Sequence, residues 1–377
     1  MASKSLSIFV HSFLLFMIGL SVGIISTSYR LNNFSSFPFT VPASIFPIST
    51  RSSLSLPQSP PPPLLPLNAT KKLDEKKSLE PHNMTDDELL RLAAATSSSA
   101  AKTFKDVAKV AFMFLTPGPL PLAPLWEKFF EGHQHLFSIY IHTHPSYNQS
   151  FPDTSVFYGR RIPSKAVFWG TISMIEAERR LLANALLDLS NQRFVLLSDS
   201  CIPLFNFTTT YHYLMASTLS FLQSYDDPRK PGRGRYSRRM SPAITVQQWR
   251  KGSQWFEIRR DLAAKIVSDK KYYAVFRDHC LPPCYSDEHY LPTLVNILWP
   301  DATSNRSVTW VDWSRAGSHP RKFGWIDVKL EVLDKIRFGG KECVYSGNPT
   351  RICFLFARKF LPNTSGPLLR LAPSLLA

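Results

Sequence analysis

Polar side chains that could bind a ligand occur at the ends of two apolar runs. His142 and His144 close the run 137–142, and Ser198-Asp199-Ser200 follows the run 194–197. In an open parallel sheet, ligands bind beyond the carboxyl ends of the strands, so we expect both groups to lie at a binding site. The alternative for the two histidines is that they simply close a strand.

Asp199 is a single carboxylate just after the apolar run 194–197. Hard divalent cations need several oxygen ligands, so one aspartate is a poor metal site. We expect Asp199 either to bind hydroxyl groups of a sugar or ribose or to cap the next turn. The chain also lacks a Walker loop, a dinucleotide fingerprint and an HExxH motif, which excludes three common classes of enzyme.

Strands that alternate with helices must position these side chains. The apolar pattern predicts strands at 107–115, 137–142 and 194–197, separated by helices at 122–131 and 173–189. This alternation indicates an α/β domain with a mostly parallel sheet and helices on both faces. The second half is less regular, and its expected elements are a basic loop at 226–239, strands at 253–258 and 307–313, and helices at 261–268 and after Pro292.

The N-terminal part of the chain predicts a secreted or membrane-anchored protein. Residues 5–29 carry no Lys, Arg, Asp or Glu, and an apolar helix of about 20 residues spans a bilayer core of about 30 Å. We therefore expect a short cytoplasmic tail at 1–5 and a transmembrane signal anchor at 6–28. The alternative is a long signal peptide cleaved near Ser26.

Glycosylation sequons support a lumenal orientation for everything that follows the apolar run. Seven Asn-x-Ser/Thr sites occur, all after residue 30, which favours exposure to a secretory lumen. The formal net charge of +16 predicts anionic binding partners. In a secretory lumen we expect these to be anionic glycans, phosphates or membrane lipid rather than nucleic acid. The expected glycosylation sites are Asn33, Asn68, Asn83, Asn148, Asn206, Asn305 and Asn363.

Composition separates a stem from a folded domain. Residues 29–105 are rich in Pro and Ser, with four consecutive prolines at 60–63, which is typical of an extended, disordered lumenal stem. Thr85 and Glu88 have the spacing of a capping box, so one short helix is expected within it. The chain as a whole is 44% hydrophobic, which excludes complete disorder. We expect a catalytic domain at 106–362 and a C-terminal tail at 363–377.

The five cysteines allow at most two disulfides and one remaining thiol in an oxidising lumen. His279, Cys280, Cys284 and His289 have the residue types of a zinc site. Because two prolines separate the cysteines and the compartment is oxidising, we expect a disulfide-bearing loop there instead.

Five ordered blocks carry a family resemblance, at residues 109–115, 194–204, 249–256, 284–291 and 309–313. Together they resemble the Core-2/I-branching β-1,6-N-acetylglucosaminyltransferase family, glycosyltransferase family 14, and most of all its plant subgroup. The resemblance covers about residues 107–362. It implies a Golgi type II membrane enzyme with a GT-A-like, Rossmann-like fold, which transfers a sugar from a UDP-sugar with inversion and needs no cofactor or divalent metal.

The resemblance also implies roles for individual residues. Alone, a carboxylate near a helix start is ordinary helix electrostatics, but the family pattern in Ser286-Asp287-Glu288 makes Glu288 the general base. Asp287 beside it is a candidate sugar-binding residue. Pro292 departs from the animal pattern and predicts that the helix begins near it, with Glu288 in the preceding turn.

Cations must stabilise a departing diphosphate where no metal does. The block 355–360 resembles the family's C-terminal segment and assigns Lys359 to this role. The family's second cation has no direct counterpart, so Lys341, Arg337 and Arg351 are the candidates. Six cations in 229–239 form either a solvated loop or a lid over the donor or an acidic acceptor.

Aromatic residues give the last candidate contacts. Trp255 could stack on a sugar ring, although Trp249, Trp255, Trp310 and Trp313 are all more often core residues. We expect N-acetylglucosamine as the transferred sugar and a glycan of a glycoprotein, proteoglycan or polysaccharide as acceptor. The alternatives are glucuronate transfer to proteoglycan or wall glycans, or a non-catalytic, membrane-anchored glycan-binding scaffold.

Overall fold

The computed structural model describes residues 82–99, 107–315, 317, 319–340 and 342–377. The expected anchor at 6–28, the sequons at Asn33 and Asn68 and most of the stem lie outside these residues. Within the part that is described, no helix has the length and apolar character needed to cross a membrane.

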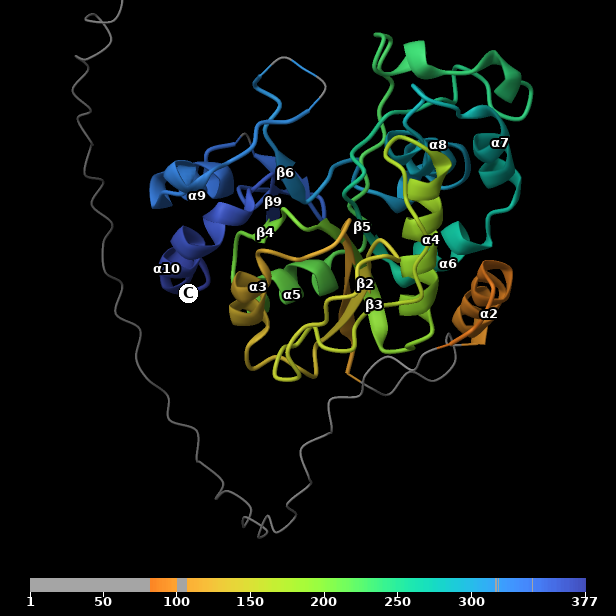
Figure 1. Ribbon diagram of the computed structural model, residues 1–377. Helices are drawn as coiled ribbons and strands as arrows, with labels where there is room; N and C mark the ends of the chain where they lie inside the picture. Colours follow the sequence, from red (N-terminus) through yellow and green to blue (C-terminus); the bar gives the residue numbers. More distant parts are fainter. Residues whose placement is uncertain (1–81, 100–106, 316, 318, 341) are drawn as a thin grey trace, which may run out of the picture. The chain divides into compact units, whose positions relative to one another are not determined.

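The core of the domain is a four-stranded, mostly parallel sheet (Figure 1). Its strands are β1 (Lys109–Leu115), β2 (Phe137–His142), β3 (Asn191–Ser198) and β5 (Glu257–Arg259), in the order β2-β1-β3-β5. Strands β2 and β3 pair with β1 in parallel, and β5 is antiparallel to β3. The prediction of a mostly parallel sheet is confirmed, and it brings His142 and Ser198 to the same edge.

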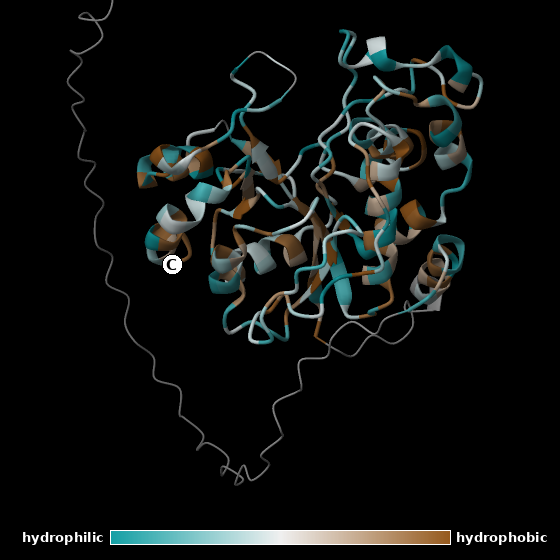
Figure 2. Cartoon of the chain, in the orientation of Figure 1, coloured by the Kyte–Doolittle hydropathy of each residue, from teal (hydrophilic) through white to brown (hydrophobic). Residues whose placement is uncertain are grey.

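Helices cover both faces of this sheet because residues of β1 alternate between two apolar clusters. Phe112 and Phe114 pack with Trp126 of α3 (Ala123–Phe130) on one face. Ala111 and Met113 belong to the other cluster, with Leu181 of α4 (Ile172–Leu186) and with α6 (Arg260–Ser268). Figure 2 shows the apolar colour concentrated in the strands and in the helix faces that meet them. Burial of both faces explains why β1 is an almost continuous apolar run.

A second, three-stranded sheet brings the C-terminal part of the chain beside β3. Strand β9 (Phe356–Arg358) lies between β4 (Ile202–Pro203) and β6 (Thr309–Val311). Helix α5 (Phe207–Ala216) follows β4, and α9 (Leu330–Phe338) follows β6. Through this sheet, residues that follow β9 reach the edge where β3 ends.

The range expected to be a C-terminal tail, 363–377, is instead part of the folded domain. Helix α10 (Ser365–Leu375) contacts α3, and its residues Leu368 and Leu375 are fully buried. The apolar spacing of this short helix includes an internal proline, which weakens a helix prediction from sequence.

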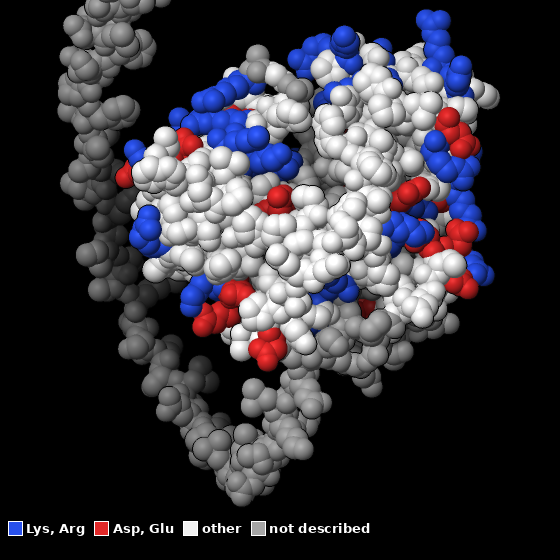
Figure 3. Space-filling view, in the orientation of Figure 1, with Lys and Arg blue, Asp and Glu red and all other residues white. Residues whose placement is uncertain are grey.

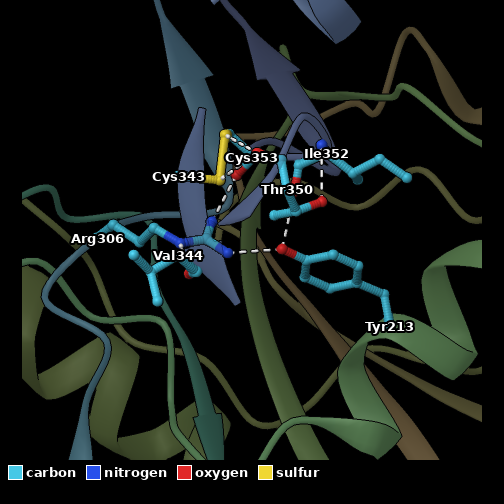
Figure 4. Close-up of a disulfide and its surroundings, with 7 residues drawn as sticks. All are labelled: Tyr213, Arg306, Cys343, Val344, Thr350, Ile352 and Cys353. Atoms are coloured by element: carbon cyan, nitrogen blue, oxygen red, sulfur yellow. Dashed lines mark hydrogen bonds between the residues drawn. A yellow bond between two sulfur atoms is a disulfide. The ribbon is translucent and has the colours of Figure 1, made fainter. Parts of the chain in front are cut away.

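A disulfide-closed hairpin precedes β9 (Figure 4). Strands β7 (Cys343–Tyr345) and β8 (Asn348–Thr350) form it, and Cys343 is bonded to Cys353. Arg306 holds the hairpin on the domain by donating hydrogen bonds at 2.6 Å to the Tyr213 hydroxyl and 2.6 Å to the Cys353 carbonyl. The hairpin therefore fixes the approach of the chain to β9.

The predicted helix within the stem exists as α2 (Asp86–Ser99), and it begins with the predicted capping box. The Thr85 amide donates to the Glu88 carboxylate at 2.8 Å, and the Glu88 amide donates to the Thr85 hydroxyl at 3.3 Å. The helix buries Leu89 and Ala93 and contacts α4 and α6. This part of the range 29–105 thus packs on the catalytic domain, which corrects the domain boundary expected at 106.

The segment between α6 and the second sheet contains α7 (Lys271–His279) and α8 (Tyr290–Leu298). As predicted, Pro292 lies in the first turn of α8, where its missing N–H costs no helical hydrogen bond. Cys280 and Cys284 form the expected disulfide, which removes both as thiolate ligands for the zinc alternative. The thiol that remains, Cys201, is buried.

Candidate active site

A cavity of about 860 Å³ lies at the carboxyl edge of the parallel sheet. Leu115, His142 and Ser198 line it from the ends of β1, β2 and β3, and Arg358 and Lys359 line it from the end of β9. This is the place where open α/β sheets bind ligands, as we expected from the sequence. Other sequence-predicted residues also lie on its wall, namely His144, Asp199, Trp255, Asp287, Glu288 and Trp313.

Asp199 and Lys359 lie near each other because β4 and β9 are paired. The Phe360 amide donates a hydrogen bond of 3.0 Å to the Ser200 carbonyl, which ties the residue after Lys359 to the residue after Asp199. Burial, and then the charge of Arg358, lower the pKa of Lys359, while the Asp199 carboxylate acts in the opposite direction. The result is a half-buried cation beside a lone carboxylate on the wall of the cavity.

Arg358 is a second cation at this position, and sequence reasoning did not single it out. Its guanidinium lies 4.1 Å from the ring centroid of Trp255, which is a cation–π contact. Trp255 is 6% exposed, so most of its surface is already covered. Trp255 therefore lines the cavity mainly as a support for Arg358, with little surface free for a sugar ring.

Glu288 lies in a single turn of 3-10 helix, Ser286–Glu288, directly before α8, as predicted. Its carboxylate accepts a hydrogen bond of 2.6 Å from Arg235 and another from Lys251. Burial raises the pKa of this carboxyl, but the combined charges and hydrogen bonds of Lys251 and Arg235 outweigh burial and hold it below the usual value. Glu288 is therefore a charged carboxylate on the cavity wall at neutral and mildly acidic pH.

Asp287 differs from its neighbour in environment. Its side chain is 7% exposed, and Oδ1 has no hydrogen-bond partner in the part of the chain that the structure describes. Burial, and then the charge of Glu288, raise the pKa of Asp287 to about 6. Two adjacent carboxyl groups thus have opposite pKa shifts, a pattern that is typical of functional sites.

The basic loop 229–239 contributes part of the cavity wall. Arg229 and Arg235 line the cavity, and the Arg235 guanidinium also lies 4.3 Å from the ring centroid of Tyr285. Arg229 pairs with Asp227, and Arg233 pairs with Asp226, which gives each of those carboxylates a cationic partner. The loop is therefore more than a solvated segment. Figure 3 shows Lys and Arg side chains on both sides of the hollow in the face that is drawn.

Two cations proposed for the diphosphate do not lie at this site. Arg351 is exposed beside the disulfide-closed hairpin and does not line the cavity. Arg337 is in α9, where it pairs with Asp334 and lies against Phe205. Lys341 lies outside the described residues. These candidates were chosen by their nearness in sequence to a cysteine, whereas the cation that lines the cavity next to Lys359 is Arg358 of β9.

The four tryptophans have different environments. Trp249 is a core residue, stacked on Phe276 and His289, and its indole donates to the Gly232 carbonyl at 3.1 Å. Trp310 is half-buried and packs against Phe323. Trp313 is 54% exposed and lines the cavity, so it has a free face for a ligand.

Several functional candidates were missed by sequence reasoning. Lys251 lies in the block 249–256 that carries the family resemblance, but nothing in the sequence indicated that it would contact Glu288. Arg235 was one of six cations in the loop, with nothing to distinguish it. Arg358 stands next to Lys359 in the block 355–360, and this position was its available signal.

The sequons fall into two groups among the residues that the structure describes. Asn83, Asn148 and Asn363 are exposed. The Asn206 side chain caps α5 by accepting a hydrogen bond of 2.8 Å from the Thr209 amide. Asn305 accepts one of 2.7 Å from the Ser224 amide. Chain folding thus already uses the side chains of Asn206 and Asn305.

This arrangement combines a charged carboxylate, a second buried carboxyl and several cations around one cavity, which suits transfer of a group from an anionic donor to a hydroxyl. Comparisons with known proteins agree with it. A sequence model of the Core-2/I-branching enzyme family matches residues 110–337. The chain is 38% identical over 298 residues to the glycosyltransferase BC10 of Oryza sativa subsp. japonica, with 67% of this chain and 74% of that protein covered. The chain is a glycosyltransferase of the Core-2/I-branching family, with a mixed α/β fold consistent with the GT-A type.

Proposed function

We propose that the enzyme transfers a sugar from a UDP-sugar to a glycan hydroxyl with inversion, with Glu288 as general base and without a divalent metal. The observation that carries this proposal is the convergence of Asp199, Glu288 and Lys359 on one cavity from three distant parts of the sequence. Chance placement of such residues would spread them over the surface.

The proposed reaction is a single displacement. The acceptor oxygen attacks the anomeric carbon, its proton passes to the Glu288 carboxylate, and the bond to the UDP oxygen breaks with the electron pair leaving on the diphosphate. Lys359 and Arg358, which lie at the end of β9, would stabilise the negative charge of the leaving diphosphate. These cations would supply the positive charge that a bound metal ion supplies in other transferases.

The proposal also covers which sugar is transferred and which acceptor receives it. N-acetylglucosamine is our first candidate for the transferred sugar, and glucuronate is the alternative. The exposed Trp313 on the cavity wall is consistent with an acceptor that presents a sugar ring. Acceptors on glycoproteins, proteoglycans and polysaccharides all meet this condition.

A Golgi membrane location with a lumenal catalytic domain is also proposed. The uncharged apolar run at 6–28 and the exposed sequons at Asn83, Asn148 and Asn363 support it. Endoglycosidase treatment of the protein from glycosylating cells should increase its gel mobility. No change in mobility, in cells that glycosylate a control protein, would contradict the lumenal orientation.

The test of the proposed function is release of UDP by the purified lumenal chain, residues 31–377, incubated with a panel of UDP-sugars and glycan acceptors. We expect acceptor-dependent UDP release with one donor, and a product whose anomeric configuration is opposite to that of the donor. If no donor is turned over but glycans still bind, the chain is a glycan-binding scaffold. A product that retains the donor's configuration would overturn the inverting mechanism.

A further inference from the structure

An ion pair joins the helix that precedes the catalytic domain to a buried arginine. Asp86, the first residue of α2, accepts two hydrogen bonds of 2.8 Å from Arg180 of α4, one to each carboxylate oxygen. Lys165 donates a third, at 2.7 Å. The Arg180 side chain is 4% exposed, and a buried guanidinium is costly unless it is paired. Asp86 is thus the counterion of Arg180.

Arg180 in turn contacts a histidine on the wall of the cavity. Its Nη1 donates a hydrogen bond of 3.1 Å to Nε2 of His142, whose side chain is fully buried. Arginine has no acceptor, so Nε2 must accept, and the single ring proton of neutral His142 is then on Nδ1. Burial, and then the charge of Arg180, lower the pKa of His142 to about 4, which keeps the ring neutral.

The Nδ1–H group of His142 forms no hydrogen bond of good geometry with the described part of the chain. Buried donors are almost always satisfied, so a donor left over on a cavity wall points to an oxygen atom of a ligand. The cations proposed to bind the diphosphate, Arg358 and Lys359, are not at this position. They lie near the end of β3, where the Phe360 amide donates a hydrogen bond to the Ser200 carbonyl. His142 ends β2, two strands from β3, which is about 10 Å at the usual strand spacing.

We propose that Asp86, acting through Arg180, is a positioning residue that fixes the tautomer of His142, and that His142 Nδ1–H binds an uncharged oxygen of the donor's nucleoside. A separation of about 10 Å suits a nucleoside whose diphosphate is at the β3 and β9 end. This inference rests on the proposed use of a UDP-sugar. It also makes α2 part of the functional domain, although α2 lies outside the residues that the family model matches.

Paired substitutions at His142 test the proposal, because two amides resemble different halves of the imidazole. His142→Asn keeps a donor near the Nδ1 position, and His142→Gln keeps an acceptor near the Nε2 position but removes that donor. Calorimetric UDP binding to the lumenal chain should weaken about fivefold to tenfold in His142→Gln, as expected for one lost hydrogen bond, and less in His142→Asn. Pyrophosphate binding should be equal in both variants.

Asp86→Asn tests the positioning role, with Asp87→Asn as the matched control. Asp87 is exposed in the same helical turn, and the structure gives its side chain no ion pair. We expect Asp86→Asn to raise the KM for the donor with a smaller change in kcat, Asp86→Glu to restore it in part, and Asp87→Asn to match the wild type. Thermal unfolding of each variant identifies those that fail to fold, and the His142 pair then carries the test.

The outcomes separate this inference from the proposed function. If the wild-type chain binds no UDP, the proposed function itself fails. If it binds UDP and His142→Gln binds equally well, the His142 contact is absent. Equal weakening of UDP and pyrophosphate binding would place His142 at the diphosphate and would overturn the assignment to the nucleoside.

Discussion

The carboxylate of Glu288 accepts a hydrogen bond from the Arg235 guanidinium at 2.6 Å, although the two residues are 53 positions apart in the sequence. Lys251 contacts the same carboxylate oxygen. One oxygen of Glu288, Oε2, therefore accepts both hydrogen bonds, while Oε1 accepts none from a described residue. This geometry connects the proposed base to the basic loop and to the segment before β5.

The ion pairs predict how activity depends on pH. Since Lys251 lowers the pKa of Glu288, Lys251→Met should raise that pKa and move the acid limb of the kcat/KM profile to higher pH. The wild-type base would stay deprotonated in mild acid, where the variant would be protonated and inactive. Lys128→Met, which removes an exposed pair with Glu131, is the control and should leave the profile unchanged. An identical acid limb in the Lys251 variant would exclude Glu288 as the titrating base.

The raised pKa of Asp287 predicts that the folded protein loses stability as the pH rises. Its pKa is raised to about 6 in the folded protein, so its contribution to stability is complete below the unfolded value near 4 and is lost as the pH rises through 6. Asp287→Asn removes this loss. The free energy of unfolding of the variant, relative to the wild type, should rise by about 3 kcal/mol between pH 4 and pH 7, because each pKa unit corresponds to about 1.4 kcal/mol. Denaturant titrations at the two pH values measure it, and a constant difference would show that Asp287 ionises normally.

Lys359 and Arg351 form a test pair of basic residues, one inside the cavity and one outside. Lys359→Ala should lower kcat and raise the KM for the donor together, because the cation would contact the diphosphate before and during its departure. Arg351→Ala should leave both constants within about twofold of the wild type, as most surface substitutions have small effects. Steady-state kinetics with varied donor measure this contrast. Equal losses in the two variants would contradict the placement of the diphosphate at β9.

Chelation tests the metal-independent part of the proposal. Asp199 is a single carboxylate, and the nearby Asp226 and Asp227 are paired with arginines, so we expect activity to survive EDTA. The measurement is the initial rate of UDP release before and after chelation. Complete loss that Mn²⁺ restores would mean that carboxylates of this chain bind an ion, and that the account of the diphosphate site is wrong.

The sequence correctly predicted those strands and helices whose residues show a clear apolar pattern or a helix-start signal. The apolar run 107–115 became β1 because a strand buried on both faces must be apolar throughout, and Pro292 marked the start of α8 because its ring fits only the first helical turn. The helix α10 was missed because its short apolar stripe contains Pro373, and because tertiary contacts, among them those with α3 and α9, stabilise it.

Residues of the candidate site that lie in a recognisable motif were predicted from the sequence. Residues that only tertiary contacts bring to the site were missed. Glu288 and Lys359 stood in recognisable blocks, and both line the cavity. The partners of Glu288 could not be deduced, because the contact of Arg235 with it depends on how the loop 229–239 folds back across the domain. Arg351 was favoured by sequence distance alone, and pairing of β9 with β4 and β6 placed Arg358 there instead.

The central claim is that Glu288 takes the acceptor's proton, and turnover of Glu288→Gln tests it most directly. Glutamine keeps the size of glutamate and can still accept a hydrogen bond, but it cannot take a proton at neutral pH. With an acceptor and the preferred UDP-sugar, kcat should fall about 10²–10⁴-fold while the unfolding temperature stays near that of the wild type and Glu131→Gln remains fully active. A folded Glu288→Gln enzyme with near wild-type kcat would contradict the account, and the base would then have to be another group on the same cavity.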